Sequence, residues 1–167
     1  MSGAHDLPTP LLEQPAVPSL AVEHLFDMAV DLEVPHVFET PVGTRLTYII
    51  KSGKIRGPQI HGDLLPGGGD WVVLGSDGVS RMDIRGAIHT DDDALIHYSA
   101  LGVARLPDDG RDRIARGERI PFEEGYIRTT PRFETSDERY MWLNGQVFLG
   151  VNEFSARHID HRYYRVL

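Results

Sequence analysis

Residues 26–33 read Phe-Asp-Met-Ala-Val-Asp-Leu-Glu, so that apolar side chains at every second position alternate with acidic or small ones. A period of two is typical of a β-strand with one face in the core and one in solvent, because successive side chains point to opposite faces. Val30, Val34 and Pro35 favour an extended chain over a helix at this place. The segment therefore predicts a half-buried strand.

The same alternation returns along the chain, in short segments bounded by residues that favour turns. Gly75-Ser76-Asp77-Gly78 is a strong hairpin signal between two of these segments. The 17 glycines and 11 prolines likewise favour many short strands over long helices. Further strands are expected at residues 46–51, 71–74, 82–89, 95–101, 126–130, 140–143, 147–151 and 163–166.

About eight to ten strands with little helix to cover them predict an all-β fold, in which the sheet must close on itself or form a sandwich. We expect a single antiparallel β-barrel over residues 20–167, because closure removes unpaired edges and leaves an interior that can hold a small ligand. The charged segment 107–124 is expected to be a surface loop with a short helix, or else a lid over the cavity.

Residues 1–19 are expected to form an extended or disordered N-terminal arm, because four prolines fall within the first 18 residues. Leu11, Leu12 and Val17 leave open a second interpretation, in which the arm straps across a neighbouring subunit of a homodimer or other homo-oligomer. No secretory signal and no apolar run near the roughly 18–20 residues of a membrane span is present, so a cytoplasmic protein without membrane contacts is expected.

The composition excludes several classes of protein. The chain of 167 residues has no cysteine, which excludes disulfides, thiolate metal sites and a cysteine nucleophile. Its formal net charge of −8 argues against nucleic-acid binding, which needs a basic face. The eight histidines are scattered and form no compact ligand motif, so no metal site is predicted. No serine lies in a nucleophile motif either.

The most informative motif starts at residue 57 and reads Gly-Pro-Gln-Ile-His-Gly-Asp-Leu-Leu-Pro-Gly-Gly-Gly-Asp-Trp. Its three consecutive glycines let the backbone pass close to a ligand or another strand. No Gly-Lys-Ser/Thr and no helix-forming run follow, so this is neither a phosphate loop nor a dinucleotide site. Asp70 then lies at the mouth of a strand beside Trp71, either as a turn residue that bonds local backbone or as a functional carboxylate.

This motif resembles the bacterial family known as domain of unknown function 3237. The resemblance spans residues 22–167 and continues at residues 77–78, 82–85, 90–96, 132–135 and 140–144. It departs at Asp92-Asp93, where the family pattern has Asp-Gly at the turn. The resemblance implies a small β-barrel similar to the allene oxide cyclase and lipocalin-like barrels, and it implies no settled activity.

Asp83 and Arg85 lie two residues apart on a predicted strand, so their side chains point to one face, which His89 shares. If this face is in solvent, these charges only aid solubility. If it lines the barrel, they provide an acid, a cationic clamp and a titratable base. The resemblance at Asp83 and Arg85 favours the interior arrangement.

Trp142 and Asn144 form a second candidate pair, because they also alternate on a predicted strand. A tryptophan and an asparagine on one face suit the wall of a small-molecule pocket. Asn144-Gly145 is equally a preferred hairpin turn, in which case Trp142 is a core residue.

The hypothesis from the sequence is an enzyme without cofactor or metal, of isomerase, cyclase or lyase type, that acts on a small apolar or aromatic molecule inside the barrel by general acid/base chemistry. A carrier or sensor that binds a small molecule without converting it is the alternative, and an interaction module is a third. The candidate catalytic residues are Asp70, Asp83, Arg85 and Asn144. The candidate substrate-binding residues are Tyr48, Trp71, His89, Tyr98 and Trp142.

Overall fold

The structure is a computed structural model that describes residues 19–167. The arm expected at residues 1–19 lies, except for its last residue, outside the described residues. In chain order the elements are β1 (Val22–Leu32), β2 (His36–Thr40), β3 (Gly43–Arg56), β4 (His61–Leu64), β5 (Gly69–Leu74), β6 (Ser80–Thr90), β7 (Leu95–Arg105), α1 (Gly110–Ala115), β8 (Tyr126–Glu134), the 3₁₀ helix η1 (Met141–Gly145), β9 (Phe148–Ser155) and β10 (His158–Val166).

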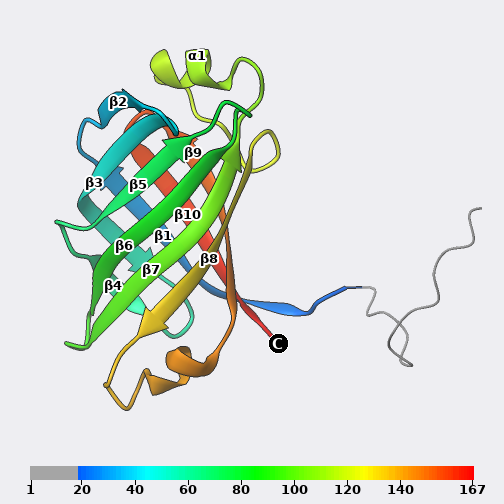
Figure 1. Cartoon of the computed structure of the whole chain (residues 1–167). Coiled ribbons are helices and arrows are strands. Elements are labelled where there is room, and N and C mark those ends of the chain that lie inside the picture. The colour runs from blue at the N-terminus through cyan, green and yellow to red at the C-terminus, as the bar shows by residue number, and fades with distance from the viewer. Residues whose placement is uncertain (1–18) are drawn as a thin grey trace, which may run out of the picture.

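The strands form one antiparallel sheet that closes into a barrel (Figure 1). From β1 the sheet runs through β10, β9, β8, β7 and β6 to β4 and β3, and β3 pairs back with β1. The short strands β4 and β5 pair with successive parts of β3 and β6, so together they fill one position of the eight-stranded barrel. The predicted all-β barrel is confirmed.

The interior follows from the alternation in the sequence. In β1, the side chains of Phe26, Met28, Val30 and Leu32 are buried inside, as the period of two predicts. One half of the barrel is filled by aromatic rings in edge-to-face and stacked contacts, with centroids 5.1–6.2 Å apart. These rings belong to Phe26, Tyr98, Phe133, Phe148 and Tyr163.

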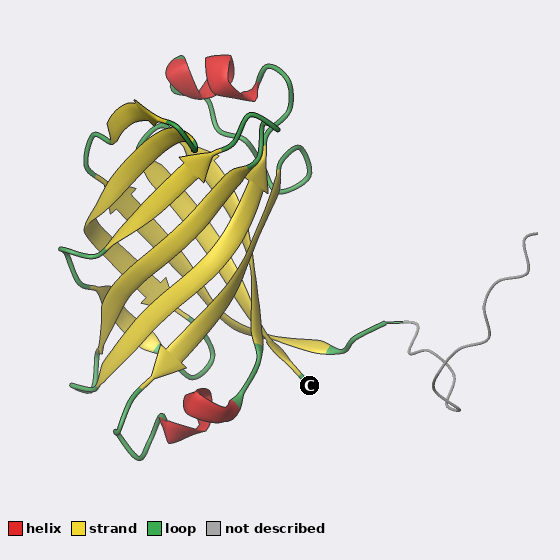
Figure 2. Cartoon of the chain, in the orientation of Figure 1, coloured by secondary structure: helices red, strands yellow, loops and turns green. Residues whose placement is uncertain are grey.

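The two ends of the barrel differ. Helix α1 lies across one end and η1 lies at the other, beyond the aromatic half (Figure 2). The expected loop with a short helix at residues 107–124 is therefore present as α1 and its flanking turns. No helix among residues 19–167 has the length and apolar character that crossing a bilayer requires.

The prediction of a strand at residues 140–143 is wrong, since this stretch forms η1 and the residue before it. The chain must turn between β8 and β9, and it does so with bonds between residues three apart. The Tyr140 N–H donates to the Asp137 carbonyl, and the Leu143 N–H donates to the Tyr140 carbonyl. Local helical bonds thus satisfy a backbone that has no neighbouring strand.

Two of the consecutive glycines are required for different reasons. Gly67 has a φ of +93°, a left-handed conformation that side chains rarely adopt. A Cβ on Gly68 would lie 2.9 Å from the Gly86 Cα and closer still to the Arg85 carbonyl oxygen, so only glycine lets β5 begin this close to β6. The motif therefore fixes where Asp70 enters the barrel.

We expect Gly68→Ala to cost about 3 kcal/mol of unfolding free energy, because the new methyl group would collide with backbone that cannot move alone. Gly67→Ala has open space around its methyl group and should cost only about 1 kcal/mol, from backbone strain. Urea unfolding of both variants measures the difference. A Gly67→Ala cost equal to or above that of Gly68→Ala would contradict this account of the motif.

Candidate functional site

A cavity of about 560 Å³ lies inside the end of the barrel that α1 covers. Its walls come from strands all around the barrel and from the inner side of α1, and most of its side chains are apolar. A ligand-sized, largely apolar cavity with a few polar groups is the usual form of a small-molecule site. The apolar lining residues are Val37, Leu46, Val72, Met82, Ala104, Leu106, Ile114, Ala115, Ile127, Phe154 and Ile159, and the polar ones are Tyr48, Asp70, Ser80, Arg111 and Asn152.

Asp70 is the buried carboxyl of this cavity, with 7% of its surface exposed. It lies at the start of β5. There Asp70 pairs with Ile84 of β6, and Val73 pairs with Arg81 in the same register, but the two residues between them, Trp71 and Val72, do not pair with β6. The backbone N–H of Asp83 donates to Asp70 Oδ1 at 3.1 Å instead. This hydrogen bond, which forms at the gap in the pairing of β5 with β6, holds the carboxyl in place.

The environment of Asp70 keeps its carboxyl largely uncharged below neutral pH. Burial raises the pKa of Asp70 from 3.8 to about 7, because a carboxylate loses its hydration there. The Asp83 N–H lowers this pKa, and the negative charge of the Asp83 side chain raises it. Among the described residues, no arginine or lysine forms an ion pair with Asp70. The carboxyl therefore exists in both protonation states near pH 7.

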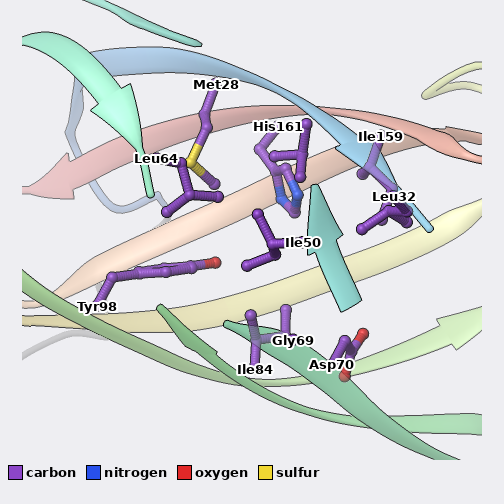
Figure 3. Close-up of a pocket in the computed structure, with 11 residues that line it drawn as sticks. Met28, Leu32, Ile50, Leu64, Gly69, Asp70, Ile84, Tyr98, Ile159 and His161 are labelled. Carbon is purple, nitrogen blue, oxygen red and sulfur yellow. The ribbon is translucent and has the colours of Figure 1, made fainter. Parts of the chain in front are cut away.

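A second, much smaller cavity of about 20 Å³ lies deeper in the barrel, and Asp70 lines this one too. His161 on β10 and Tyr98 on β7 line it with Asp70 (Figure 3). The hydroxyls of Tyr98 and Tyr163 are 2.5 Å apart, and the Tyr163 hydroxyl is 3.0 Å from His161 Nδ1. Asp70 thus lies between the ligand-sized cavity and a buried hydrogen-bonded chain.

The three side chains of this hydrogen-bonded chain, Tyr98, Tyr163 and His161, are neutral at physiological pH. Burial lowers the pKa of His161 to about 3 and raises the pKa values of Tyr98 and Tyr163. The charge of Asp70 contributes to both tyrosine shifts, so all three groups share one low-dielectric region. Asp70 is therefore the group on this side of the cavity whose charge changes near pH 7.

Tyr48 on β3 lies within the influence of two charges. Burial and the negative charge of Asp70 raise the pKa of Tyr48, and the positive charge of Arg111 lowers it. Tyr48 and Arg111 both line the large cavity, as Asp70 does. The cavity therefore has a cation on α1, a phenol on β3 and a titrating carboxyl on β5.

Asn152 on β9 has the fourth notable polar side chain. It is 2% exposed and lines the large cavity, yet its Oδ1 has no hydrogen-bond partner within residues 19–167. Buried polar atoms nearly always have a partner, so an unpartnered amide in the wall of a cavity stands out. The amide of Asn152 is thus a candidate ligand contact.

The comparisons with known proteins agree with this fold. The model of a family described as protein of unknown function (DUF3237) matches residues 20–166. The chain belongs to this family. A UPF0311 protein of Rhodopseudomonas palustris is 30% identical to it over 144 residues, which cover 86% of this chain and 92% of the relative.

Solved structures show the same architecture. A β-barrel like protein from Acinetobacter baumannii has a TM-score of 0.74 and 28% identity, with 92% of this chain and 100% of that chain covered. A structure described as an enzyme from Penicillium herquei has a TM-score of 0.67 and 20% identity, with 92% and 100% covered. The second likeness shows the shared fold alone. The fold that the resemblance to this family implied is confirmed.

The structure brings only some of the predicted site residues together. Asp70 and Tyr48 line the large cavity, and Tyr98 lines the small one next to Asp70. The interior arrangement expected for Asp83 and Arg85 is wrong, because their side chains are 45% and 64% exposed and pair with each other at 3.2 Å on the outside of the barrel. The apolar side chains that alternate with them face inward.

Four other predicted residues also lie outside the two cavities that Asp70 lines. Trp71 is 41% exposed, and the half-exposed His89 contacts Asp93. Trp142 packs beside Arg165, whose guanidinium carbon is 5.7 Å from the ring centroid, at the η1 end. Asn144 bonds both the N–H and the carbonyl of Thr135, at 2.9 and 2.8 Å, so it stabilises the turn rather than a pocket wall. These placements correct the expected site.

The turn at residues 90–94, where the chain departs from the pattern of this family, keeps the geometry that glycine would favour. Asp93 has a φ of +68°, and its N–H donates to the Thr90 carbonyl at 3.0 Å. Aspartate adopts this left-handed conformation more readily than most residues. The Asp-Asp sequence is therefore compatible with the turn.

The sequence interpretation missed Arg111 and Asn152 as site residues. The alternation in β9 contains a signal for Asn152, because it lies in phase with the buried Phe148. Arg111 has no comparable signal, since it is one of several charged residues in the 107–124 segment. Only the position of α1 over the barrel end brings it to the cavity.

Proposed function

We propose that the barrel binds a small, largely apolar organic molecule in the 560 Å³ cavity and transfers protons at it, with Asp70 as the general acid and base. Isomerisation, cyclisation and elimination are the reaction types that this chemistry serves. One observation carries the proposal: a buried carboxyl with a pKa of about 7 faces a ligand-sized apolar cavity. A general base or acid works best when its pKa is near the working pH.

The surroundings of Asp70 support a functional over a structural role. Many carboxylates of this chain that have structural contacts pair with arginine, as Asp27 does with Arg162 at 2.8 Å. Asp70 instead accepts a bond from a single backbone N–H, and its burial among apolar side chains keeps a charge there unfavourable. A structural carboxyl would gain little from this arrangement, whereas a proton-transfer group needs it.

The proposed reactions move protons and electron pairs within the ligand and Asp70, and they need no oxidant or reductant. In an isomerisation, the Asp70 carboxylate accepts a proton from one carbon of the ligand, an electron pair shifts to form the new double bond, and the carboxylic acid returns a proton to another atom. In an elimination, the departing group takes the electron pair of its bond instead. The Tyr48 hydroxyl and the side-chain N–H of Asn152 donate hydrogen bonds to an oxygen of the ligand that gains negative charge. Because its pKa is raised, Tyr48 keeps its proton at neutral pH.

Exposure of the protein to a small-molecule extract from bacterial cells tests for turnover. Wild-type protein and Asp70→Asn are each incubated with the extract, and bound and free compounds are compared by mass spectrometry. We expect the variant to retain a compound that the wild type converts into a product of equal mass, or into two fragments. Asp83→Asn, whose carboxylate lies on the outside, serves as the control and should behave like the wild type.

A carrier would behave differently in the same experiment. Wild type, Asp70→Asn and Asp83→Asn would then all retain the same compound and release it unchanged. That result would contradict the enzyme proposal and favour a ligand-binding barrel. A loss of conversion in Asp83→Asn equal to that in Asp70→Asn would contradict the assignment of the base.

A further inference from the structure

Helix α1 places one arginine at the large cavity. Arg111 is exposed, lines the cavity together with Ile114 and Ala115, and forms no ion pair among the described residues. The rest of the lining contains no other cation. Within the described residues, a guanidinium that lines this largely apolar cavity without a partner carboxylate is free to bind an anion.

The other three arginines of the 107–124 segment are all in ion pairs. Arg113 pairs with Glu118 at 3.3 Å and also contacts Glu124. Arg116 pairs with Glu118 at 2.8 Å. Arg119 pairs with Glu153 on β9 at 3.3 Å. These pairs attach the segment to itself and to the barrel. Arg111 contributes to none of them, so its guanidinium is available to a ligand.

The polar groups of the cavity are ordered along it. Tyr48 on β3 is the cross-strand neighbour of Asp70 on β5, and Arg111 lines the same cavity from α1, which covers the end of the barrel. Asn152, which is 2% exposed, lines the same cavity and has an amide oxygen without a hydrogen-bond partner among the described residues. A ligand with a charged group at Arg111 therefore extends its body into the barrel, towards the neighbouring side chains of Tyr48 and Asp70.

We infer that Arg111 is the anion-binding residue of the cavity, and that the ligand class is an apolar carboxylic acid bound as its carboxylate. This inference rests on the proposed function and names the substrate class for that site. The guanidinium offers paired N–H donors that match a carboxylate. The apolar body of the acid is then covered by side chains of the cavity wall such as Leu46, Val72 and Phe154.

The placement also keeps two negative charges apart. The carboxylate of the ligand binds at α1, and the carbon that reacts lies near Asp70, which is neutral in part of the population at pH 7. Arg111 takes the role of cationic clamp that the sequence interpretation gave to Arg85. Arg85 lies on the outside and pairs with Asp83.

A matched pair of probes tests this inference: 2-naphthoate, which carries a carboxylate, and 2-naphthamide, which has nearly the same shape and no charge. Affinities are measured by calorimetry at pH 6, where 2-naphthoate is ionised and Asp70 is mostly protonated. We expect wild type to bind the acid more tightly than the amide. Arg111→Gln should weaken binding of the acid by about tenfold or more, as expected for a lost charge-assisted contact, and binding of the amide by less than about twofold.

Arg105→Gln is the control variant. Arg105 ends β7, is exposed, has no ion pair among residues 19–167 and does not line the cavity, so the substitution removes the same charge from a neighbouring strand end. It should leave both affinities unchanged.

The outcomes separate the inference from the proposed function. If both probes bind and Arg111→Gln weakens neither, or weakens both equally, Arg111 is not the anion-binding residue and the inference is overturned while the cavity site stands. If Arg105→Gln weakens 2-naphthoate as much as Arg111→Gln does, the effect is one of net charge and the inference is also overturned. If neither probe binds wild type, both the ligand cavity and the inference are contradicted.

Discussion

Asp70→Asn is expected to make the barrel more stable than wild type at pH 8, by up to about 4 kcal/mol, although it alters the centre of the proposed site. The pKa of Asp70 is about 7 in the folded protein, against an ordinary value near 3.9 in an unfolded chain. Between these values the folded state holds a proton that the unfolded state has lost. The unfolding free energy of wild type therefore falls as pH rises from about 4 to about 7, and the lower value persists above pH 7.

The magnitude follows from the size of the shift, since each unit of pKa difference corresponds to about 1.4 kcal/mol. Asparagine is uncharged at every pH, so the variant lacks this fall, and its side-chain oxygen can still accept the bond from the Asp83 N–H. Urea unfolding of both proteins at pH 5, 6, 7 and 8 measures the difference. At pH 5 the variant should be the more stable protein by only about 1.5 kcal/mol, and at pH 8 by about 4 kcal/mol.

Asp83→Asn provides the control for this experiment. It removes a half-exposed carboxylate from the outside of the barrel and leaves the buried one in place. Its stability should still fall between pH 5 and pH 8, as that of wild type does. Parallel pH curves for wild type and Asp70→Asn would show that Asp70 titrates at an ordinary pKa, and would contradict the account of the site.

The second large effect concerns proton abstraction from a bound molecule. Wild type is expected to accelerate the ring opening of 5-nitrobenzisoxazole, a small apolar compound that needs only a base. The base removes the proton on carbon 3, the C–H electrons form the nitrile, and the N–O bond breaks to give a phenolate. A carboxylate in an apolar cavity suits this reaction, because it is poorly hydrated there.

Asp70→Asn should lower this rate by about a hundredfold or more, a typical contribution of a positioned general base. The wild-type rate should rise with pH through a midpoint near 7 and then level off, because the ionised carboxylate is the base. Asp83→Asn should retain most of the rate. A wild-type rate no higher than that of Asp70→Asn, or a rate that Asp83→Asn loses equally, would contradict the role of Asp70.

The fold was largely predictable because a strand carries its information locally. Alternation at residues 26–32 predicts which side chains of β1 face the core, and the glycine motif predicts a close approach between strands. The stretch at residues 140–143 misled the prediction because an alternating pattern also fits a short turn. What decides between the two is whether a neighbouring strand is available, and the sequence of the segment does not contain that information.

The site was less predictable because it depends on which face of each strand is inside. Asp83 and Arg85 were correctly expected to share a face, but that face is the outer one, since Met82 and Ile84 fill the interior. Asp70 could be singled out because the glycines before it restrict where the backbone can lie. Arg111 could not, because its position depends on how a loop between β7 and β8 crosses the end of the barrel.

Titration of the Asp70 carboxyl itself, followed by carbon-13 NMR and assigned with Asp70→Asn, tests the central claim most directly. We predict a midpoint near pH 7, and a higher midpoint when 2-naphthoate fills the cavity, because a second negative charge disfavours ionisation. A midpoint near pH 4 would contradict the claim that this barrel holds a proton-transfer group beside a ligand site.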